Sequence, residues 1–279
     1  MPELPEVQTV VDDLIAAGLP GAVITAARIF WKKTVATHSL ADFNKEIRNR
    51  RINTISRRGK YIIFHLLPEV DLLFHLRMTG RFVVAPAGSH RTRHDHLILR
   101  LADGRQLRFH DPRKFGRVFL VSRHTAITGR LGPEPLAAGF SAKKLDAMLS
   151  VRHRQLKPLL LDQTFVAGLG NIYVDEALWD ARLHPLTHAA SLDADQARDL
   201  QRAIRKVLRQ GLKNAGTTLG DGRANFYSLE RKRGRNRSFL KVFRRTGLPC
   251  PRCGQPIERL VVGQRSTHIC SRCQKPPGR

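Results

Sequence analysis

Four cysteines near the end of the chain form the residue pattern with the most specific chemistry. Cys250 and Cys253, followed by Cys270 and Cys273, make two Cys-x2-Cys pairs. Two such pairs offer four thiolates, the ligand set of a structural tetrahedral Zn²⁺ site with no position left for water. Two disulfides are the alternative, but they belong to oxidising compartments, and the first residues predict no export signal. The spacing therefore predicts one structural zinc ion that holds a hairpin with its tip at Gly263–Thr267.

The first residues place a secondary amine beside carboxylates. Pro2, Glu3 and Glu6 stand where an apolar helical pattern begins. One interpretation is structural, because proline suits the first helical turn and acidic groups favour the positive end of a helix. The other is chemical: once Met1 is removed, an α-amino group titrates near ~7.7–8.0 and is partly unprotonated at neutral pH. Such an amine attacks an aldehyde-level carbon to form an iminium, whose charge acidifies the adjacent carbon and favours elimination.

A glycine-rich turn precedes a predicted helix in the second half of the chain. Residues 166–171 read VAGLGN, and a helical stretch follows over 172–179. Glycines permit tight turns, and a helix N-terminus offers backbone N–H groups to a phosphate. A dinucleotide-binding turn needs a third glycine and a preceding strand, whereas the helical segment LKPLLLDQ comes before this one. The pattern favours a DNA-backbone clamp, with a plain interhelical turn as the alternative.

The elements that must position these groups follow from the hydrophobic pattern. Apolar residues at helical spacing predict a helix over 1–18, ended by Gly18. From about 22 to 122, short runs of β-branched and aromatic residues predict strands, with a hairpin turn at Asp103-Gly104. These strands indicate a β-sandwich against which the first helix packs. After the Gly/Pro-rich stretch 131–140, the pattern is helical to about residue 214.

Charge is the strongest feature of the composition. The 279 residues include 49 Lys and Arg against 23 Asp and Glu, a formal net charge of +26. A basic excess of this size indicates a polyanionic partner, most simply nucleic acid. The hydrophobic fraction of 42% is typical of a globular protein. An apolar run of the ~18–20 residues that a membrane span needs does not occur in the sequence.

Nine motifs together resemble the formamidopyrimidine-DNA glycosylase family of bifunctional base-excision enzymes, which includes endonuclease VIII. Their order and spacing run nearly from end to end of the chain, as MPELPEV (1–7), RRGKY (57–61), HLRMTG (75–80), RHDH (93–96), DPRKFG (111–116), LGPEPL (131–136), LDQTFVAGLGNIYVDEAL (161–178), GTTL (216–219) and QRSTHICSRCQ (264–274). The resemblance implies an α+β fold in three parts. These are a catalytic β-sandwich domain with an N-terminal helix over 1–130, a helix–two-turn–helix domain over 131–240, and a zinc finger over 241–279.

The resemblance also implies a catalytic set. Pro2 matches the nucleophile that attacks the sugar C1′, and Glu3 matches the general acid/base. Lys60 matches the lysine that contacts the phosphate beside the lesion and assists β-elimination. Without the resemblance it reads as a turn lysine between two strands. Arg265 on the zinc hairpin matches the arginine that assists δ-elimination.

A second set of residues falls on DNA-contact positions of the family. His94, Arg113 and Arg152 are similar to its DNA-binding residues, and Gly170 with Asn171 matches its phosphate clamp. The family also has a wedge, a set of side chains that fills the gap left by a flipped base. Its counterparts in this chain are Met78, Arg113 and Phe115, which we call the wedge residues. Core packing is the alternative for an isolated methionine or phenylalanine, but the polar context of HLRMTG and DPRKFG favours the wedge.

The implied activity is excision of oxidised purines, 8-oxoguanine and formamidopyrimidines, followed by β,δ-elimination at the abasic site. The implied partner is duplex DNA that contains oxidised bases or abasic sites, bound by a cytoplasmic monomer with no membrane association. Two alternatives remain: an oxidised-pyrimidine glycosylase of the endonuclease VIII type, and a non-catalytic zinc-containing DNA-binding protein. The match fades between Gly220 and Phe239, where a basic loop (229–239) reads either as an extra phosphate contact or as a solvated segment.

Overall fold

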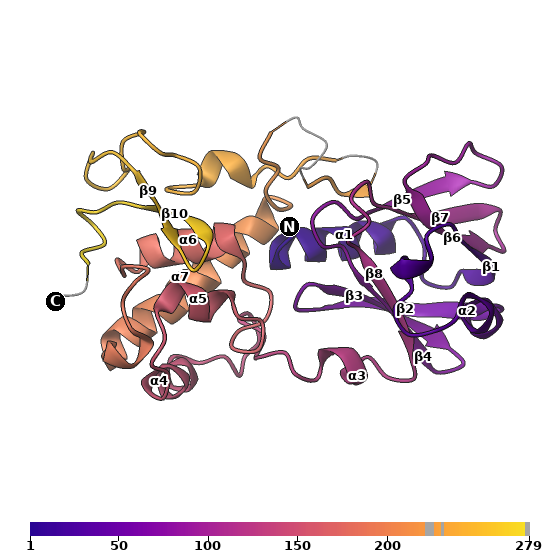
Figure 1. The fold of residues 1–279 in the computed structure, drawn as a ribbon, viewed down its shortest axis with the longest axis horizontal. Coiled ribbons are helices and arrows are strands. Elements are labelled where there is room, and N and C mark those ends of the chain that lie inside the picture. The colour runs from indigo at the N-terminus through magenta and orange to yellow at the C-terminus, as the bar shows by residue number, and fades with distance from the viewer. Residues whose placement is uncertain (221–225, 230–231, 277–279) are drawn as a thin grey trace. The chain divides into compact units, whose positions relative to one another are not determined.

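The computed structural model describes residues 1–220, 226–229 and 232–276 (Figure 1). The chain divides into two compact units. The first contains Met1–Arg130 and Asn214–Arg235, and the second contains Leu131–Lys213 and Asn236–Arg279. A late segment of the chain therefore belongs to the same unit as the N-terminus.

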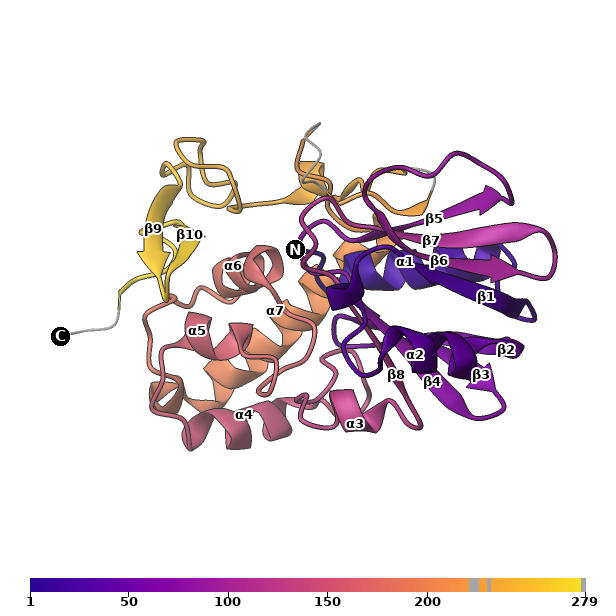
Figure 2. The same ribbon diagram turned by 45° about the vertical axis from the view of Figure 1, so that its right-hand side comes forward.

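The first unit is built on an antiparallel sheet with the strand order β5-β7-β6-β1-β2-β3-β4-β8. Strands β1 and β2 pair only through Val23 with Arg51 and Ile24 with Arg50, so the sheet folds at this junction. Figure 2 shows the two resulting layers, β5-β7-β6-β1 and β2-β3-β4-β8. The strands are β1 (Val23–Ile29), β2 (Arg50–Arg58), β3 (Tyr61–Leu67), β4 (Val70–His75), β5 (Arg81–Pro86), β6 (Asp95–Leu101), β7 (Arg105–His110) and β8 (Arg117–Val121).

Helix α1 (Leu4–Ala16) closes the core of this sandwich. Its apolar stripe, Val7, Val10, Val11 and Leu14, is buried in one cluster with inward-facing residues of both layers. Gly18 follows the helix with φ 68°, the left-handed conformation expected of its cap. The helix and the strands confirm the predicted sandwich. Helices α2 (Leu40–Ile47) and α3 (Thr125–Thr128) and the short turn η1 (Lys32–Thr34) complete the unit.

The second unit is helical. Its elements are α4 (Ala142–Ser150), α5 (Leu156–Leu161), α6 (Asn171–Asp180), η2 (Ala189–Ser191), α7 (Ala194–Lys213) and η4 (Asn236–Phe239). Helix α7 buries Ala197, Leu200, Ala203, Ile204 and Leu208, which lie on one stripe at helical spacing. Helix α6 is buried along nearly its whole length, from Ile172 to Trp179. The chain then ends in the hairpin β9 (Glu258–Val262) and β10 (Arg265–Ile269), so the α+β class predicted from the sequence is confirmed.

Within the described residues, none of the helices combines the length and the apolar character that a membrane span requires. The basic loop predicted over 229–239 is only partly described, since 230 and 231 lie outside the described residues. Of the region where the family resemblance fades, residues 221–225 also lie outside them.

Candidate functional site

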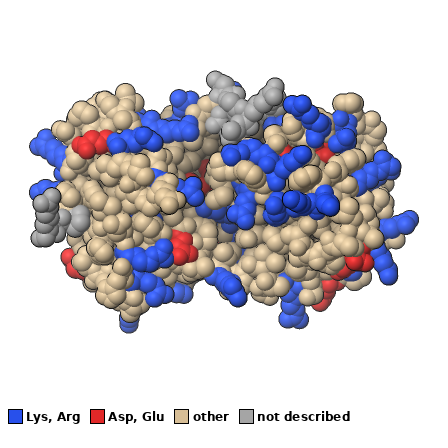
Figure 3. Space-filling view, in the orientation of Figure 1, with Lys and Arg blue, Asp and Glu red and all other residues tan. Residues whose placement is uncertain are grey.

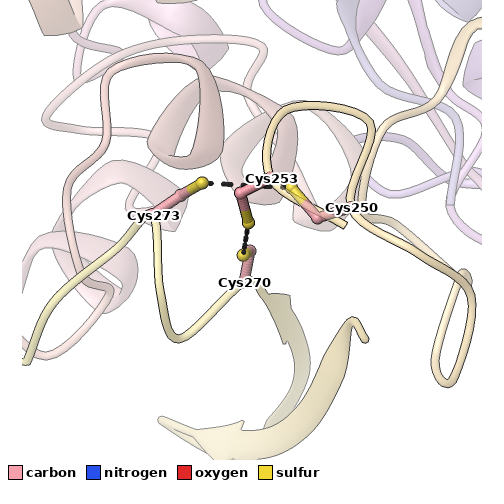
Figure 4. Close-up of side chains that lie close together, drawn as sticks. All are labelled: Cys250, Cys253, Cys270 and Cys273. Carbon is pink, nitrogen blue, oxygen red and sulfur yellow. Dashed lines mark hydrogen bonds between the residues drawn. The ribbon is translucent and has the colours of Figure 1, made fainter. Parts of the chain in front are cut away.

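The four cysteines converge at the base of the β9–β10 hairpin. Their Sγ atoms all lie within 4.8 Å of one another, and Figure 4 shows the side chains pointing toward a common centre. The Sγ atoms of Cys253 and Cys270 are 3.4 Å apart, and those of Cys250 and Cys273 are 4.0 Å apart. Four sulfurs at 2.3 Å from a tetrahedral Zn²⁺ stand about 3.8 Å from one another. The thiols are not joined in disulfides, so the set fits one structural zinc ion and the disulfide alternative is excluded.

The groups around Cys250 favour its thiolate form. Trp179 Nε1 donates to Cys250 Sγ at 3.4 Å. Burial raises the pKa of Cys250, but hydrogen bonds from the Arg252 backbone and from Trp179 outweigh burial and lower that pKa to about 6. Zinc binds cysteine only as thiolate, so these donors support metal binding. The indole also packs with Val242, Ile257 and the buried cysteines in a small apolar cluster.

The N-terminus is held by a buried carboxylate. Glu3 caps helix α1, and Glu6 Oε2 accepts the backbone N–H of Glu3 at 2.9 Å in a capping box. Glu6 Oε1 accepts the backbone N–H of Thr217 at 2.7 Å, which joins α1 to the GTTL motif. A Cβ on Gly216 would lie 2.9 Å from Glu6 Cγ, and the glycine has φ 78°. Glycine is therefore required at this approach, and Glu6 has the structural role that its position at the helix start suggests.

Pro2 lies in a small recess of the first unit. Most of its lining comes from the segment around Met78 and from residues 226–227. The lining residues are Pro2, Met78, Thr79, Gly80, Arg81, Pro112, Phe226 and Tyr227. The structure thus brings the predicted nucleophile beside one of the three wedge residues. Phe226 and Tyr227 were not singled out by sequence analysis, because they lie in the region between Gly220 and Phe239 where the motifs fade.

Lys60 lies at the turn between β2 and β3 and is only 4% exposed. Nearby, the backbone N–H of Arg77 donates to His75 Nδ1 at 3.1 Å, which requires that nitrogen to be unprotonated. Burial, together with the positive charges of Arg77 and Lys60, lowers the pKa of His75 to about 3. His75 is therefore neutral at physiological pH, and it holds Arg77 in a left-handed conformation (φ 53°) just before Met78.

One carboxylate organises both loops that carry the wedge residues. Asp111, 1% exposed, accepts the Thr79 hydroxyl of the first loop. It also accepts the backbone N–H of Arg113 at 3.2 Å and of Gly116 at 2.7 Å in the second. Between these bonds the tips project outward: Phe115 is 47% and Met78 39% exposed. Asp111 opens the DPRKFG motif, so the signal was present in the sequence, but its bridging role required the fold.

Exposure of the wedge side chains excludes core packing as their role. The guanidinium of Arg113 lies 4.7 Å from the centroid of the Phe115 ring, a cation–π contact. Behind them, a Cβ on Gly116 would lie 2.4 Å from a ring atom of Phe109, so the loop can approach the core only with glycine there. The loop therefore presents an arginine and an aromatic ring together at the surface.

His94 lies in the loop before β6, on a frame of buried polar groups. Asp95, 2% exposed, accepts the Thr92 backbone N–H and His110 Nδ1, each at 2.8 Å. Burial raises the pKa of Asp95, but these hydrogen bonds outweigh it and lower the pKa to about 2. The ring of His94 packs edge-on against His110 at 5.6 Å. The Asp95 carboxylate thus fixes the loop from which His94 projects.

The glycine-rich turn is held together by Gln163. Gln163 Oε1 accepts the Gly168 N–H at 3.0 Å, and its Nε2 donates to the Leu169 carbonyl at 2.8 Å. Gly168 has φ 91°, and Gly170 stands at the N-cap of α6. The Asn171 amide then donates to the Ser266 carbonyl at 2.8 Å, beside Arg265 on the hairpin. The structure therefore joins the predicted clamp to the hairpin that carries Arg265.

A buried ion pair completes this junction. Lys157, fully buried, lies 2.5 Å from Asp175 Oδ1 and donates to the Ser266 carbonyl at 2.9 Å. Asp175 Oδ2 accepts the backbone N–H of His268 at 2.9 Å. These contacts fix the backbone on both sides of the hairpin strand, while the Arg265 side chain is exposed. Sequence analysis missed both charged residues, because nothing local distinguishes them from surface charges.

The remaining predicted contact, Arg152, is exposed just after α4. Lys and Arg side chains are scattered over the faces of both units shown in Figure 3, with few acidic groups among them. The described residues include basic surface on each unit, exposed arginines, an exposed aromatic ring beside Arg113 and a four-cysteine metal site. These are features of a zinc-containing protein that binds nucleic acid.

Comparison with known families narrows this class. The chain matches the N-terminal domain of formamidopyrimidine-DNA glycosylase over residues 1–118 and the H2TH domain of that enzyme over 131–221. It also matches the zinc finger found in FPG and IleRS over 247–276. The chain belongs to the formamidopyrimidine-DNA glycosylase family.

Individual relatives match along the whole chain. The formamidopyrimidine-DNA glycosylases of Protochlamydia amoebophila and Herpetosiphon aurantiacus are 48% and 47% identical, covering 99% and 98% of this chain and 100% of each relative. A crystal structure of a Lactococcus lactis FPG variant in complex with Fapy-dG-containing DNA has a TM-score of 0.91 at 36% identity, covering 99% of this chain and 100% of that one. The MutM (FPG) protein from Thermus thermophilus has a TM-score of 0.88 at 40% identity, with the same coverage.

Proposed function

We propose that this protein is a base-excision DNA glycosylase with abasic-site lyase activity that removes oxidised purines. The observation that carries the proposal is the recess of the first unit, which places Pro2 beside Met78. Once Met1 is removed, this arrangement puts a nucleophilic amine next to the side chain that would fill the space of an extruded base. A flipped base costs a few kcal/mol of stacking and pairing, and less when it is damaged.

The chemistry uses the chain's own groups. With Met1 removed, the Pro2 nitrogen attacks the sugar C1′ and the base leaves with its electron pair. Glu3, 3% exposed at the N-cap of α1, is the general acid/base that moves protons during ring opening. The iminium acidifies the neighbouring carbon, so the 3′ phosphate is eliminated, and Lys60 assists this β-elimination. Arg265 assists the second elimination.

Two groups of residues hold the DNA. Met78, Arg113 and Phe115 enter the stack, with the arginine facing the unpaired base. Phosphates are held by His94, Arg152 and the clamp formed by Asn171 and the backbone N–H groups after Gly170. The zinc finger supplies Arg265, and the metal itself is structural. The three-part organisation, 1–130, 131–240 and 241–279, remains the division we propose for these roles.

The purine preference rests on the N-terminal sequence and the wedge. MPELPE, rather than MPEGPE, and the Met78, Arg113 and Phe115 set distinguish the chain from an oxidised-pyrimidine glycosylase of the endonuclease VIII type. Relatives bound to Fapy-dG-containing and abasic DNA support the same substrates here. We also propose that the protein acts as a monomer in the cytoplasm, where chromosomal DNA is its partner.

Borohydride trapping tests the proposal. Reduction of the iminium on a duplex with 8-oxoguanine opposite cytosine should give a covalent adduct, and mass spectrometry should place it on Pro2. A dihydrouracil duplex is run in parallel. An adduct only with dihydrouracil would support the proposed mechanism but would show that the substrates are oxidised pyrimidines.

The matched control is protein that retains Met1. It should bind the same duplex and form no adduct, because its Pro2 nitrogen is an amide. Trapping by this form would exclude Pro2 as the nucleophile. If protein shown by mass spectrometry to lack Met1 forms no adduct with either duplex, it is a zinc-containing DNA-binding protein and not an enzyme.

A further inference from the structure

Three adjacent strands of the first unit carry a serine, a histidine and an aspartate bonded in series. Ser56 Oγ on β2 lies 2.7 Å from His65 Nε2 on β3. His65 Nδ1 lies 2.7 Å from Asp71 Oδ1 on β4. The other carboxylate oxygen, Asp71 Oδ2, accepts the backbone N–H of His124 at 2.6 Å. These bonds link a hydroxyl, an imidazole and an oriented carboxylate, the arrangement of a nucleophile, its base and the group that orients the base.

The donors and acceptors of the three groups determine which atom donates in each of the two hydrogen bonds. A carboxylate only accepts, so His65 Nδ1 carries the proton that bonds to Asp71. In the neutral imidazole Nε2 then has a free lone pair, and the Ser56 hydroxyl donates to it. The neutral form of His65 is therefore the tautomer that can take a proton from Ser56.

The sheet positions these groups rigidly. His65 stands directly opposite Asp71 in the β3–β4 pairing, and Ser56 pairs with Ile63, two residues before His65. The neighbouring residues Phe64 and Leu72 are buried in the sandwich core, so a slip of register is strongly disfavoured. The His124 ring packs edge-on against His65 at 5.8 Å and limits its rotation.

A reagent can reach the series. The His65 side chain is 30% exposed and that of Asp71 is 13% exposed, while Ser56 is partly buried. The excision mechanism proposed above uses none of Ser56, His65 and Asp71. The chemistry of the series therefore does not rest on the proposed function.

We propose that Ser56 is an activated nucleophile that accepts an acyl or phosphonyl group from small electrophiles with a good leaving group. In the step, Ser56 Oγ forms a bond to the carbonyl carbon or phosphorus, and the bond to the leaving group breaks. The hydroxyl proton passes to His65 Nε2 and from there to the solvent or the leaving group. Asp71 is a positioning residue, because it holds the imidazole and stabilises its charged form.

The test is labelling with a fluorophosphonate, which reacts with activated serines: an O–P bond forms, a P–F bond breaks, and fluoride leaves. Trypsin releases Ser56 in the peptide Ile52–Arg57, where fragmentation distinguishes it from Thr54. The internal control is the peptide Phe82–Arg91, in which the exposed Ser89 hydroxyl donates to the Pro86 carbonyl and not to a histidine. We expect the adduct on Ser56 and not on Ser89.

Variants identify the base. Ser56→Ala should abolish the adduct, and His65→Gln should slow labelling by roughly 100-fold, the typical contribution of general-base assistance. Asp71→Asn should slow it less, and the rate with the unchanged protein should show a normal solvent deuterium isotope effect that the variants lose. Thermal unfolding and DNA binding, which should not change in Ser56→Ala or His65→Gln, report on folding. No adduct at Ser56, or an adduct whose rate survives His65→Gln, overturns the proposal.

Discussion

The wedge loops of the first unit and the zinc hairpin of the second both present an exposed arginine, yet they are held by different means. Arg113 projects from a loop behind which the sandwich core is extensive, with both sheet layers and α1 contributing buried side chains. Arg265 projects from a hairpin of two five-residue strands, where Val261 is 68% exposed. The apolar cluster beneath the cysteines is small, with Trp179, Val242 and Ile257 as its main members.

The difference follows from the apolar area that each region can bury. A small element cannot bury enough apolar surface to offset its conformational entropy, so metals and buried polar contacts stabilise it instead. The hairpin accordingly depends on four thiolates and on the Lys157–Asp175 pair. In the sandwich, packing holds the strands, and single groups such as Asp111 and His75 only direct the loop tips. The consequence of removing a polar group should therefore be large in the hairpin and modest in the wedge.

Loss of the metal should have the largest effect on DNA binding. Cys253→Ser removes one of four ligands, so zinc should be lost and DNA affinity should fall by roughly 100-fold, which is about 2.7 kcal/mol. Zinc content by atomic absorption and affinity for an abasic-site duplex check the result. Ser271→Ala, next to the cluster, is the control. Full binding by a metal-free protein would show that the hairpin does not depend on the ion.

Removal of the buried lysine is the second test of the hairpin. Lys157→Met leaves the Asp175 carboxylate buried without its cation, and breaking such a pair costs about 3–5 kcal/mol. Chemical denaturation should show this loss of stability in the unfolding transition of the second unit. The double variant Lys157→Met with Asp175→Asn should recover part of it, because the uncompensated charge is gone. Equal stability of the single and double variants would contradict an ion pair that holds the hairpin.

The pH dependence of the first unit's stability should depend on His75. Its pKa in the folded protein, about 3, lies below the ordinary value of 6.5, so its stabilisation is present above pH 6.5 and is lost as the pH falls. Between pH 6.5 and 4 the loss is at most about 3 kcal/mol, at 1.36 kcal/mol per pKa unit. His75→Gln should flatten the curve of unfolding free energy against pH. An unchanged slope in that variant would assign the acid sensitivity to other groups.

Sequence reasoning succeeded where function depends on local patterns. The cysteine spacing and the α1 stripe with Gly18 are each short in sequence, and the zinc site and the packing of the first helix followed from them. It missed groups whose role arises from long-range contacts, such as Lys157 with Asp175, and it did not show that Glu6 reaches the Thr217 backbone. A buried lysine cannot be distinguished from an exposed lysine in the sequence. Only the fold shows which carbonyl or carboxylate the buried lysine contacts. The roles of Pro2, Glu3 and the other predicted site residues stay predictions.

The smallest effect should come from Asp111. Asp111→Asn keeps the size of the side chain but replaces one acceptor oxygen by a donor, so it loses the bond from either Gly116 N–H or Thr79 and weakens the remaining ones. Because the sandwich still holds the strands, duplex affinity should hardly change, while the single-turnover excision rate should fall about tenfold, or about 1.4 kcal/mol. Phe115→Ala, which removes the wedge ring itself, is the matched comparison and should slow the same step. If Asp111→Asn lowered affinity as strongly as Cys253→Ser does, the carboxylate would support the sandwich as a whole, and the contrast between the two regions would fail.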